Sequence, residues 1–479
     1  MKKTFTYYFV ALSACLLFSF TAKAETFIVN SENFGNYFGT DGYLLESVPK
    51  GSTLDFQGTF LGEQYSLYIN KKVYVISSTG DAFFDSNTTE KKWLKFNVVA
   101  GADSTEITGL EFLNCDLFVI GASNVTIDNI KMVCNMSGVG SGTGFLAIHS
   151  GADSVIVRNS YFENGGTGSS CVTVGKGSKK DIFEKNEFMI TGSSGNILSA
   201  NMYVAGATGD TPDHLIFSEN TIYSKVAGSA FMYGIAVCGE GNVVVSNTIT
   251  MKGNAITNAY GSAGKNNLYL GNTVYDGGTV TTGEDCMLSA NELYGALSVG
   301  ARSEVMYNDI YADVVANGNK TSFEQNTING TLTLKSDSNT VQNNVIITET
   351  GEYAVLMGAK VGNIVTDNTL IAAEKTGDAA ANYTGADATA NVIENNNSET
   401  AVNTVAAAND FVISNQGGTI SITNVADNAV CNLYSASGAH LASAKASQGA
   451  VYFEVPAKGI YLVEVVANNN KVVTKIVAD

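Results

Sequence analysis

Arginine and histidine are scarce in this chain. Its 479 residues include two arginines, Arg158 and Arg302, and three histidines, His149, His214 and His440. Histidine is the commonest general acid or base in enzymes, and arginine is a common ligand for anionic groups. The sequence therefore offers few groups for acid–base catalysis, and we assign no catalytic residue from it.

Few residues are charged, and basic residues are fewer than acidic ones. Charged residues make up 15% of the chain, and 27 basic residues against 45 acidic ones give a net charge of −18. A nucleic acid would meet a negative surface with few cations to displace its counterions. Nucleic acid is therefore excluded as a partner.

Long apolar runs are absent after the N-terminus, so we expect no transmembrane helix once the first segment is removed. Disorder is excluded as well, because hydrophobic residues make up 45% of the chain. The sequence therefore predicts a folded, acidic protein.

The first 24 residues have the pattern of a signal peptide. Lys2 and Lys3 precede an apolar stretch that ends near Phe20, and small residues at 22–24 offer a cleavage site before Glu25. The mature chain would then carry 24 − 45 = −21 charges. A lipobox-like stretch at 12–15 is the alternative, and it would leave a lipidated Cys15 as the mature N-terminus.

A short phrase recurs from residue 124 onward: alternating apolar residues, one or two polar residues, an asparagine, one further residue and another apolar one. Residues 243–249, VVVSNTI, are typical. The copies lie between 17 and 34 residues apart and centre on Asn129, Asn159, Asn186, Asn220, Asn247, Asn272, Asn291, Asn308, Asn326, Asn344, Asn368 and Asn396. In the copies from Asn159 to Asn368 the residue two positions on is Tyr161, Phe188, Ile222, Ile249, Val274, Leu293, Ile310, Ile328, Ile346 or Leu370.

This pattern predicts a coil of short parallel strands. Period-two alternation indicates strands, and no stretch keeps helical spacing of apolar residues. Repeats of this length indicate stacked supersecondary units, and the consensus of a leucine-rich repeat is missing. The fold class is therefore all-β, with a solenoid at residues 51–400 and an N-terminal cap at 25–50.

The asparagines have a predicted structural role at the bends of this coil. Asparagine tolerates positive φ better than any residue except glycine, and its amide can pair with the amide one coil away. We therefore predict a ladder of inward-facing amides at Asn159, Asn186, Asn220, Asn247, Asn272, Asn291, Asn308, Asn326, Asn344 and Asn368.

The repeat resembles that of right-handed parallel β-helix proteins of the pectate-lyase-like superfamily, over roughly residues 50–400. The resemblance implies a fold shared by polysaccharide lyases, glycoside hydrolases, phage tailspikes and surface adhesins. It implies no single activity, so function has to be argued from a site.

A second module follows a predicted linker at 401–410. Short alternating runs between turn signals predict a small antiparallel β-sandwich over residues 411–479. The phrases 434–438, 456–461 and 475–477 resemble the C-terminal sorting domain of type IX secretion cargo in Bacteroidetes. That resemblance implies the secretion machinery as a partner and places the protein outside the cell or on the outer-membrane surface. A purely structural sandwich that caps the solenoid is the alternative.

Six cysteines remain in the mature chain, at positions 115, 134, 171, 238, 286 and 431. Their spacings match no metal site, and most of them lie inside apolar strand runs. We expect buried free thiols, with stacking between neighbouring coils as the alternative.

Candidate ligand-binding residues lie on the long loops between residues 190 and 265. They are Tyr203, Asp210, Asp213, Tyr233 and Tyr260. Rings at the face of a coil can stack on sugars, and the two aspartates lie in one of these loops. No metal or cofactor is expected, except Ca²⁺ if the chain were a lyase.

These observations favour a secreted or cell-surface protein without catalytic activity, adhesin-like, that binds an extracellular glycan or another cell-surface ligand. The alternative is a polysaccharide lyase or glycoside hydrolase that acts on an acidic polysaccharide. The scarcity of arginine and histidine favours the first class, whereas the clustering of long loops favours the second.

Overall fold

The computed structural model describes residues 25–61, 66–86, 94–135, 144–149, 151–165, 170–192, 196–200, 211–224, 233–258, 264–387, 389–398, 411–416, 418–435, 440–455, 459–467 and 470–478. The predicted signal peptide and linker lie outside these residues. In the described part the only helices are two short 3-10 turns, η1 (Phe34–Asn36) and η2 (Gly377–Ala380). The prediction of an all-β fold is confirmed.

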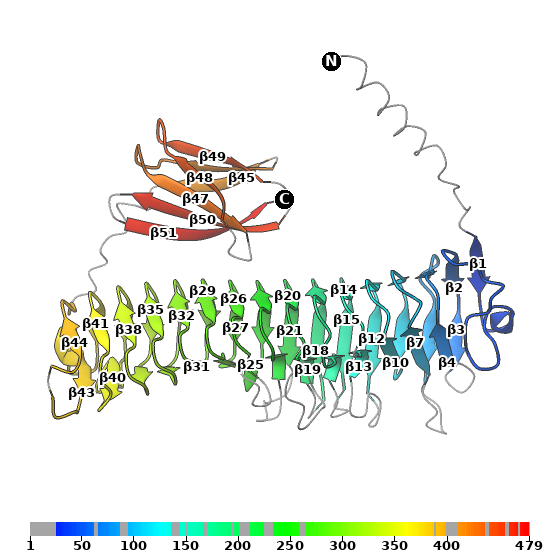
Figure 1. The fold of residues 1–479 in the computed structure, drawn as a ribbon, viewed down its shortest axis with the longest axis horizontal. Coiled ribbons are helices and arrows are strands. Elements are labelled where there is room, and N and C mark those ends of the chain that lie inside the picture. The colour runs from blue at the N-terminus through cyan, green and yellow to red at the C-terminus, as the bar shows by residue number, and fades with distance from the viewer. Residues whose placement is uncertain are drawn as a thin grey trace, which may run out of the picture.

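Three long parallel sheets make up the solenoid (Figure 1). The first sheet has sixteen strands: β1 (Thr26–Val29), β2 (Thr53–Phe56), β5 (Tyr74–Ile76), β8 (Glu106–Thr108), β11 (Thr126–Asp128), β14 (Ile156–Arg158), β17 (Ile182–Glu184), β20 (Ile216–Ser218), β23 (Val243–Val245), β26 (Leu268–Leu270), β29 (Met287–Ser289), β32 (Glu304–Met306), β35 (Ser322–Glu324), β38 (Thr340–Gln342), β41 (Ile364–Thr366) and β44 (Val392–Glu394).

The second sheet has fourteen strands: β4 (Ser66–Ile69), β7 (Lys95–Val99), β10 (Asp116–Ile120), β13 (Gly144–Ile148), β16 (Ser170–Val174), β19 (Asn196–Ala200), β22 (Tyr233–Val237), β25 (Asn254–Asn258), β28 (Thr279–Thr281), β31 (Leu297–Val299), β34 (Val314–Ala316), β37 (Leu332–Leu334), β40 (Val355–Gly358) and β43 (Ala381–Tyr383).

The third sheet also has fourteen: β3 (Thr59–Leu61), β6 (Phe83–Asp85), β9 (Glu111–Leu113), β12 (Lys131–Cys134), β15 (Tyr161–Asn164), β18 (Glu187–Ile190), β21 (Thr221–Ser224), β24 (Thr248–Thr250), β27 (Thr273–Tyr275), β30 (Glu292–Leu293), β33 (Asp309–Ile310), β36 (Thr327–Asn329), β39 (Val345–Ile347) and β42 (Thr369–Ile371).

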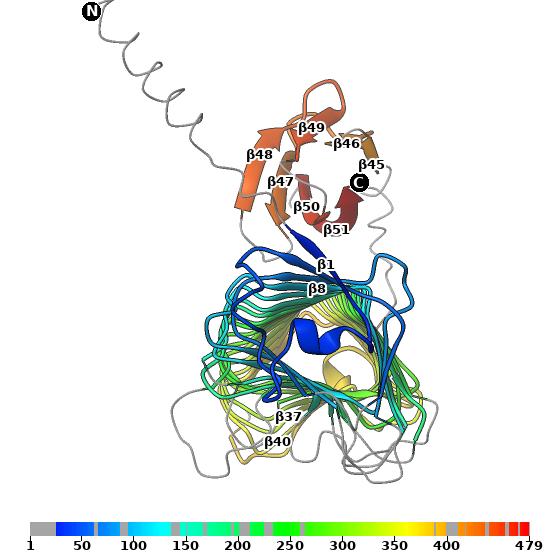
Figure 2. The same ribbon diagram turned by 90° about the vertical axis from the view of Figure 1, so that its right-hand side faces the viewer.

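Each coil passes from the first sheet to the third and then to the second, which makes the three-sided tube seen end-on in Figure 2. We call the bend from the first to the third sheet the first corner, that from the third to the second sheet the second corner, and that back to the first sheet the third corner. The chain is therefore a parallel β-helix, as predicted.

The interior is filled by one apolar residue per strand in aligned columns. Phe188, Ile222, Ile249 and Val274 pair in register along the third sheet and are fully buried. Successive side chains of a strand point to opposite faces, so the residues on either side of each buried one face solvent. At the N-terminal end the blue segment that contains η1 lies across the mouth of the tube (Figure 2), and its Phe34 and Phe38 join the core.

A ladder of asparagine amides follows the first corner. In each coil from Asn186 to Asn396, the side-chain Nδ2 of one asparagine donates to Oδ1 of the next over 2.9–3.1 Å. The same Oδ1 accepts the backbone N–H of the preceding asparagine, as between Asn308 and Asn326 (3.0 Å). The ladder therefore satisfies amide groups that would otherwise be buried without partners.

The prediction for Asn159 is wrong. Asn159 is exposed and has φ of 51°, and its Nδ2 donates outward to Asp128 Oδ1. The ladder position of that coil is the next residue, Ser160, whose N–H donates to Asn186 Oδ1. The inward apolar residue is accordingly Phe162, which stacks on Phe188, and not Tyr161.

The predicted backbone conformation of the ladder asparagines is also wrong. Positive φ falls on the residue before each of them, for example Lys185, Tyr307 and Asp367, while the ladder residues themselves do not adopt it. The left-handed residue turns the chain, and the residue after it can then direct its amide inward.

A second polar column, which the sequence analysis missed, runs inside the third corner. Asn242 donates to Asn267 over 3.2 Å, and Asn339 and Asn363 continue the pattern toward Asn391. In other coils the position is taken by other residue types, so the column has no constant sequence signature.

The six cysteines of the mature chain are buried, as expected, and none of them forms a disulfide in the described part of the chain. Burial raises the pKa of the Cys286 thiol to about 11, so this sulfur is not an activated nucleophile.

Two antiparallel sheets form the predicted C-terminal sandwich. One contains β45 (Val412–Gln416), β46 (Thr419–Thr423) and β49 (Ala450–Glu454), and the other β48 (His440–Lys445), β47 (Val430–Ser435), β50 (Gly459–Ala467) and β51 (Asn470–Ala478). The sandwich has its own apolar core, which includes Cys431 and Val463.

The sandwich lies beside the first sheet and not across the last coil, as Figure 1 and Figure 2 show. Leu462 on β50 forms an apolar cluster with Val245 and Leu270 of the solenoid, and Tyr434 on β47 packs against this cluster. In the described part of the chain, no helix is long and apolar enough to cross a membrane.

Candidate functional site

The outer face of the second sheet has a covered half and an open half. Ala147, Thr173, Ala236 and Thr257 point away from the core, yet all four are buried. From Thr281 onward the outward residues are partly exposed. From β13 onward, a ligand could therefore lie against the described part of this sheet only in the coils that begin at Thr281.

Mostly polar side chains line the floor of this open half. The outward residues in successive strands include Thr281, Ser298, Val315 and Thr333, which pair in register. Asn317, which directly follows β34, donates from Nδ2 to Ser298 Oγ over 2.6 Å. Hydroxyl and amide groups on a rigid sheet suit a ligand that carries many hydroxyls.

Three exposed tyrosines border the open half at the second corner. Tyr275, Tyr294 and Tyr311 are 38%, 39% and 43% exposed. Their rings stack in sequence, with centroids 5.3 and 4.6 Å apart. We call these three residues the tyrosine column. A contiguous row of exposed aromatic side chains commonly marks an interaction surface.

The column follows from the strand pattern of the third sheet. Val274, Leu293 and Ile310 pair in register and are buried, so the tyrosine after each one points to solvent. The sequence carried this signal, because a tyrosine stands three positions after the asparagine in three successive copies of the repeat. The aromatic residues predicted from the sequence to bind a ligand were those on the long loops, and the column was not among them.

A carboxylate orients the middle ring of the column. Tyr294 donates its hydroxyl hydrogen to Glu292 Oε1 over 2.8 Å. This hydrogen bond to Glu292, with some burial, raises the pKa of Tyr294 to about 12. The phenol therefore stays neutral at physiological pH and keeps both donor and acceptor capacity.

A hollow of about 500 Å³ lies at the C-terminal end of the open half. Its lining includes Thr333, Lys335, Leu356, Lys360 and Asn382. We call it the lysine hollow. It combines two cations with neutral polar and apolar residues, so it can take a partly charged ligand.

Three of the five residues predicted to bind a ligand, Tyr203, Asp210 and Tyr260, lie outside the described residues. Tyr233 begins β22 in the second sheet and is half-buried. Asp213 lies at the third corner, where its Oδ1 accepts the Glu240 backbone N–H (3.0 Å). The Thr211 hydroxyl donates to the same oxygen (2.9 Å). Asp213 thus has a structural role in the turn.

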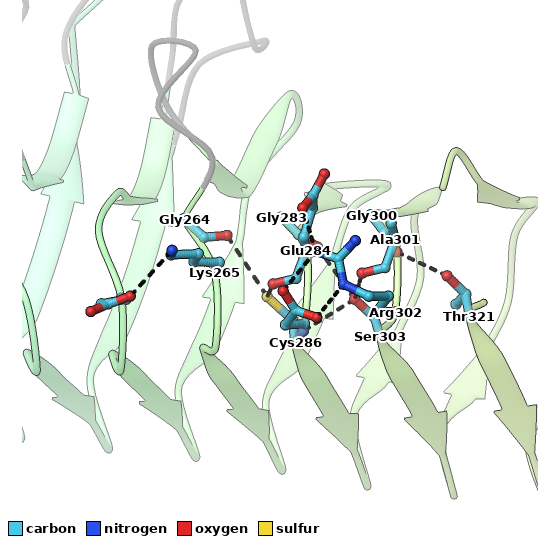
Figure 3. A network of polar contacts seen from close by, with 12 residues as sticks. Gly264, Lys265, Gly283, Glu284, Cys286, Gly300, Ala301, Arg302, Ser303 and Thr321 are labelled. Carbon is cyan, nitrogen blue, oxygen red and sulfur yellow. Dashed lines mark hydrogen bonds and ion pairs between the residues drawn. The ribbon is translucent and has the colours of Figure 1, made fainter. Parts of the chain in front are cut away.

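Both arginines of the chain are held by carboxylates. Arg302 donates from Nε to Asp285 Oδ1 and from Nη2 to Glu284 Oε2, each over 2.6 Å, in the network along the third corner that Figure 3 shows. Arg158 donates from Nε to Asp128 Oδ2 over 2.9 Å. An arginine held in this way is a fixed positive charge and does not act as a general base.

Asp181 is a fully buried carboxylic acid in the third-corner column. Its Oδ1 accepts the Val155 backbone N–H (2.9 Å), and the Ser178 hydroxyl donates to its Oδ2 (2.7 Å). Burial raises the pKa of Asp181 to about 7, against the lowering effect of these hydrogen bonds. It has no access to solvent, so we assign it to the fold and not to the site.

Among the residues that the structure describes, no group of three or more histidine, cysteine or acidic side chains is placed to hold a metal ion.

No family model and no curated protein matches the chain. Similar solved structures include PfbA, a surface adhesin of Streptococcus pneumoniae, at 11% identity and a TM-score of 0.34, covering 61% of this chain and 84% of that one. The A-module of the mannuronan C-5 epimerase AlgE6 from Azotobacter vinelandii is 14% identical with a TM-score of 0.38, covering 68% and 91%. The Dettilon tailspike protein is 12% identical with a TM-score of 0.37, covering 91% and 80%. The fold assignment itself rests on the sheet topology.

Proposed function

We propose that the chain is an exported, adhesin-like protein that binds extracellular glycans along the open half of the second sheet, without catalysis and without a cofactor. The observation that carries this proposal is the tyrosine column at the border of a polar, rigid face. Sugars offer an apolar C–H face to aromatic rings and hydroxyls to polar side chains, and this surface presents both kinds of partner.

The column supports binding of more than one sugar residue. Parallel strands repeat about every 4.8 Å along the axis, and Tyr275, Tyr294 and Tyr311 occupy three successive coils of that repeat. A rigid surface of repeated contacts loses little conformational entropy when a long ligand binds. We therefore infer an oligosaccharide or polysaccharide chain as the ligand.

We also infer that the C-terminal sandwich serves export by a type IX secretion machinery of the Bacteroidetes kind, which would place the protein outside the cell or on the outer-membrane surface. The sandwich has its own core and a separate set of sheets, which suits a unit that another protein recognises.

The first prediction tests the tyrosine column in the full mature chain. Replacing Tyr294 and Tyr311 by alanine should weaken binding to a retained glycan by roughly 10-fold, which corresponds to about 1.4 kcal/mol of lost stacking. The measurement is biolayer interferometry on glycans first selected with the wild-type protein on an array. Tyr452→Ala is the matched control, because Tyr452 lies on the sandwich and is 65% exposed.

Unchanged binding by the double variant would overturn the role of the column. The enzymatic alternative has its own readout, since a lyase would release unsaturated uronate that absorbs in the ultraviolet and a hydrolase would shorten the glycan. Retention of intact glycan supports binding without catalysis.

A further inference from the structure

The lysine hollow contains cations that lack carboxylate partners in an otherwise acidic protein. Six other cations lie within 4.0 Å of an acidic side chain: Lys71, Lys131, Arg158, Lys265, Arg302 and Lys375. Within the described ranges, no ion pair joins Lys335 or Lys360 to a carboxylate, although both line the same hollow. Two positive charges at one concave place, neither of them in an ion pair with a described carboxylate, favour an anionic ligand.

A backbone irregularity forms one side of the hollow. The pairing of β40 with β43 shifts register between Leu356 and Gly358, and Gly358 has φ of 56°. The Lys360 N–H then donates to Met357 O over 3.1 Å, which closes a turn. Such bulges re-aim side chains at the ends of strands. Here the turn brings Lys360 to the hollow that Lys335 lines from the neighbouring coil.

Neutral groups complete the lining. Thr333, Leu356 and Asn382 are the outward residues of β37, β40 and β43 and pair in register across the floor. A hydroxyl, an amide and an apolar side chain suit a sugar ring, while the two ammonium groups suit an anionic substituent on that ring.

We propose that the lysine hollow binds the anionic substituent of an acidic glycan, a carboxylate or a sulfate ester, and so selects acidic over neutral chains. This inference rests on the proposed glycan binding, because the hollow continues the open half of the second sheet. Asp337 Oδ1 accepts the backbone N–H of Val361, the residue after Lys360, over 2.9 Å. One carboxylate therefore lies near the two lysines, and the joint charge of the lysines exceeds it.

The test uses the full mature chain and three probes: tetragalacturonate, the same tetrasaccharide with its carboxyl groups reduced, and a sulfated form of the reduced tetrasaccharide. We expect the acidic probes to bind about tenfold more tightly than the neutral one, and added salt to reduce this difference. The double variant Lys335→Gln, Lys360→Gln should bind all three probes equally. Lys50→Gln, an exposed lysine near the opposite end of the solenoid, should keep the preference.

The outcomes separate the two proposals. If neutral and acidic probes bind the wild type equally, or if the double variant keeps the preference, the lysine hollow is not an anion site, whereas glycan binding stands. If no probe and no array glycan binds, both proposals fail. A preference for only the carboxylated or only the sulfated probe supports the inference and identifies the substituent.

Discussion

At the scale of single residues, the corners of the coil decide which side chains become part of the core. At the first corner, the left-handed position needs only a residue that tolerates positive φ, and Lys185, Tyr307 and Asp367 occupy it in different coils. The residue after it must satisfy buried backbone N–H groups, and this requirement selects asparagine. Asn159 stands in the first of these positions, which explains why it faces solvent.

Asp181 occupies an inward position that asparagine fills in other coils, and this choice links stability to pH. Its pKa is about 7 in the folded chain against 3.8 ordinarily, so the folded state holds a proton that the unfolded state releases between these values. The stabilising effect of this group is complete below pH 4 and is lost as the pH rises to about 7.

The second prediction follows for Asp181→Asn. An amide cannot ionise, so the variant should be more stable than the wild type near pH 8, by up to about 4 kcal/mol, with little gain near pH 4. Thermal unfolding across this pH range measures the difference. Asp337→Asn is the control, because the Asp337 carboxylate is exposed and makes a comparable bond to a backbone N–H. A gain that is independent of pH would contradict the assignment.

At the scale of the strand, one register decides which face of each strand is buried. A shift of one residue moves every side chain to the opposite face. In β15 the structure buries Phe162 and turns Tyr161 outward, so that Phe162 continues the column that contains Phe188.

The third prediction tests this register. Phe162→Ala should lower the free energy of unfolding by about 3–5 kcal/mol, because it leaves a cavity in a column of fully buried residues. Tyr161→Ala should cost less than about 1 kcal/mol, because its ring is only partly buried on the outer face. Urea unfolding followed by circular dichroism gives both values. Equal losses in the free energy of unfolding for the two variants would contradict this register, and a larger loss for Tyr161→Ala would indicate the opposite register.

At the scale of the whole molecule, the sandwich and the solenoid share a small apolar contact. Val245 and Leu270 point outward from the first sheet, yet they are only 4% and 2% exposed because Leu462 covers them. In β14 and β17, Arg158 and Glu184 occupy the column that Val245 and Leu270 continue. The apolar residues thus occur where the sandwich sits.

The fourth prediction concerns this contact. Leu462→Asp would bury a charge against Val245 and Leu270, so the sandwich should separate from the solenoid while both stay folded. Small-angle scattering should show a larger radius of gyration than that of the wild type. Leu441→Asp, at an exposed leucine of the same sandwich, should leave it unchanged. An unchanged radius for Leu462→Asp would show that the contact does not hold the two parts together.

Local patterns were enough to predict much of this architecture. Alternation of period two defines strands, and the spacing of Asn186, Asn220 and Asn247 defines the coil, because both depend on residues close together in the chain. The tyrosine column could be found in the same way, since Tyr275, Tyr294 and Tyr311 each stand three positions after a repeated asparagine in the sequence.

Other features depend on which coils lie side by side. Lys335 and Lys360 belong to no repeated phrase of the sequence, and they come close only because β37 and β40 pair and a bulge at Gly358 turns the chain. The third-corner column and the contact of Leu462 with Leu270 likewise join residues of varied type across coils or modules. Burial and charge compensation at such places are properties of the packed chain, so only the tertiary structure decides them.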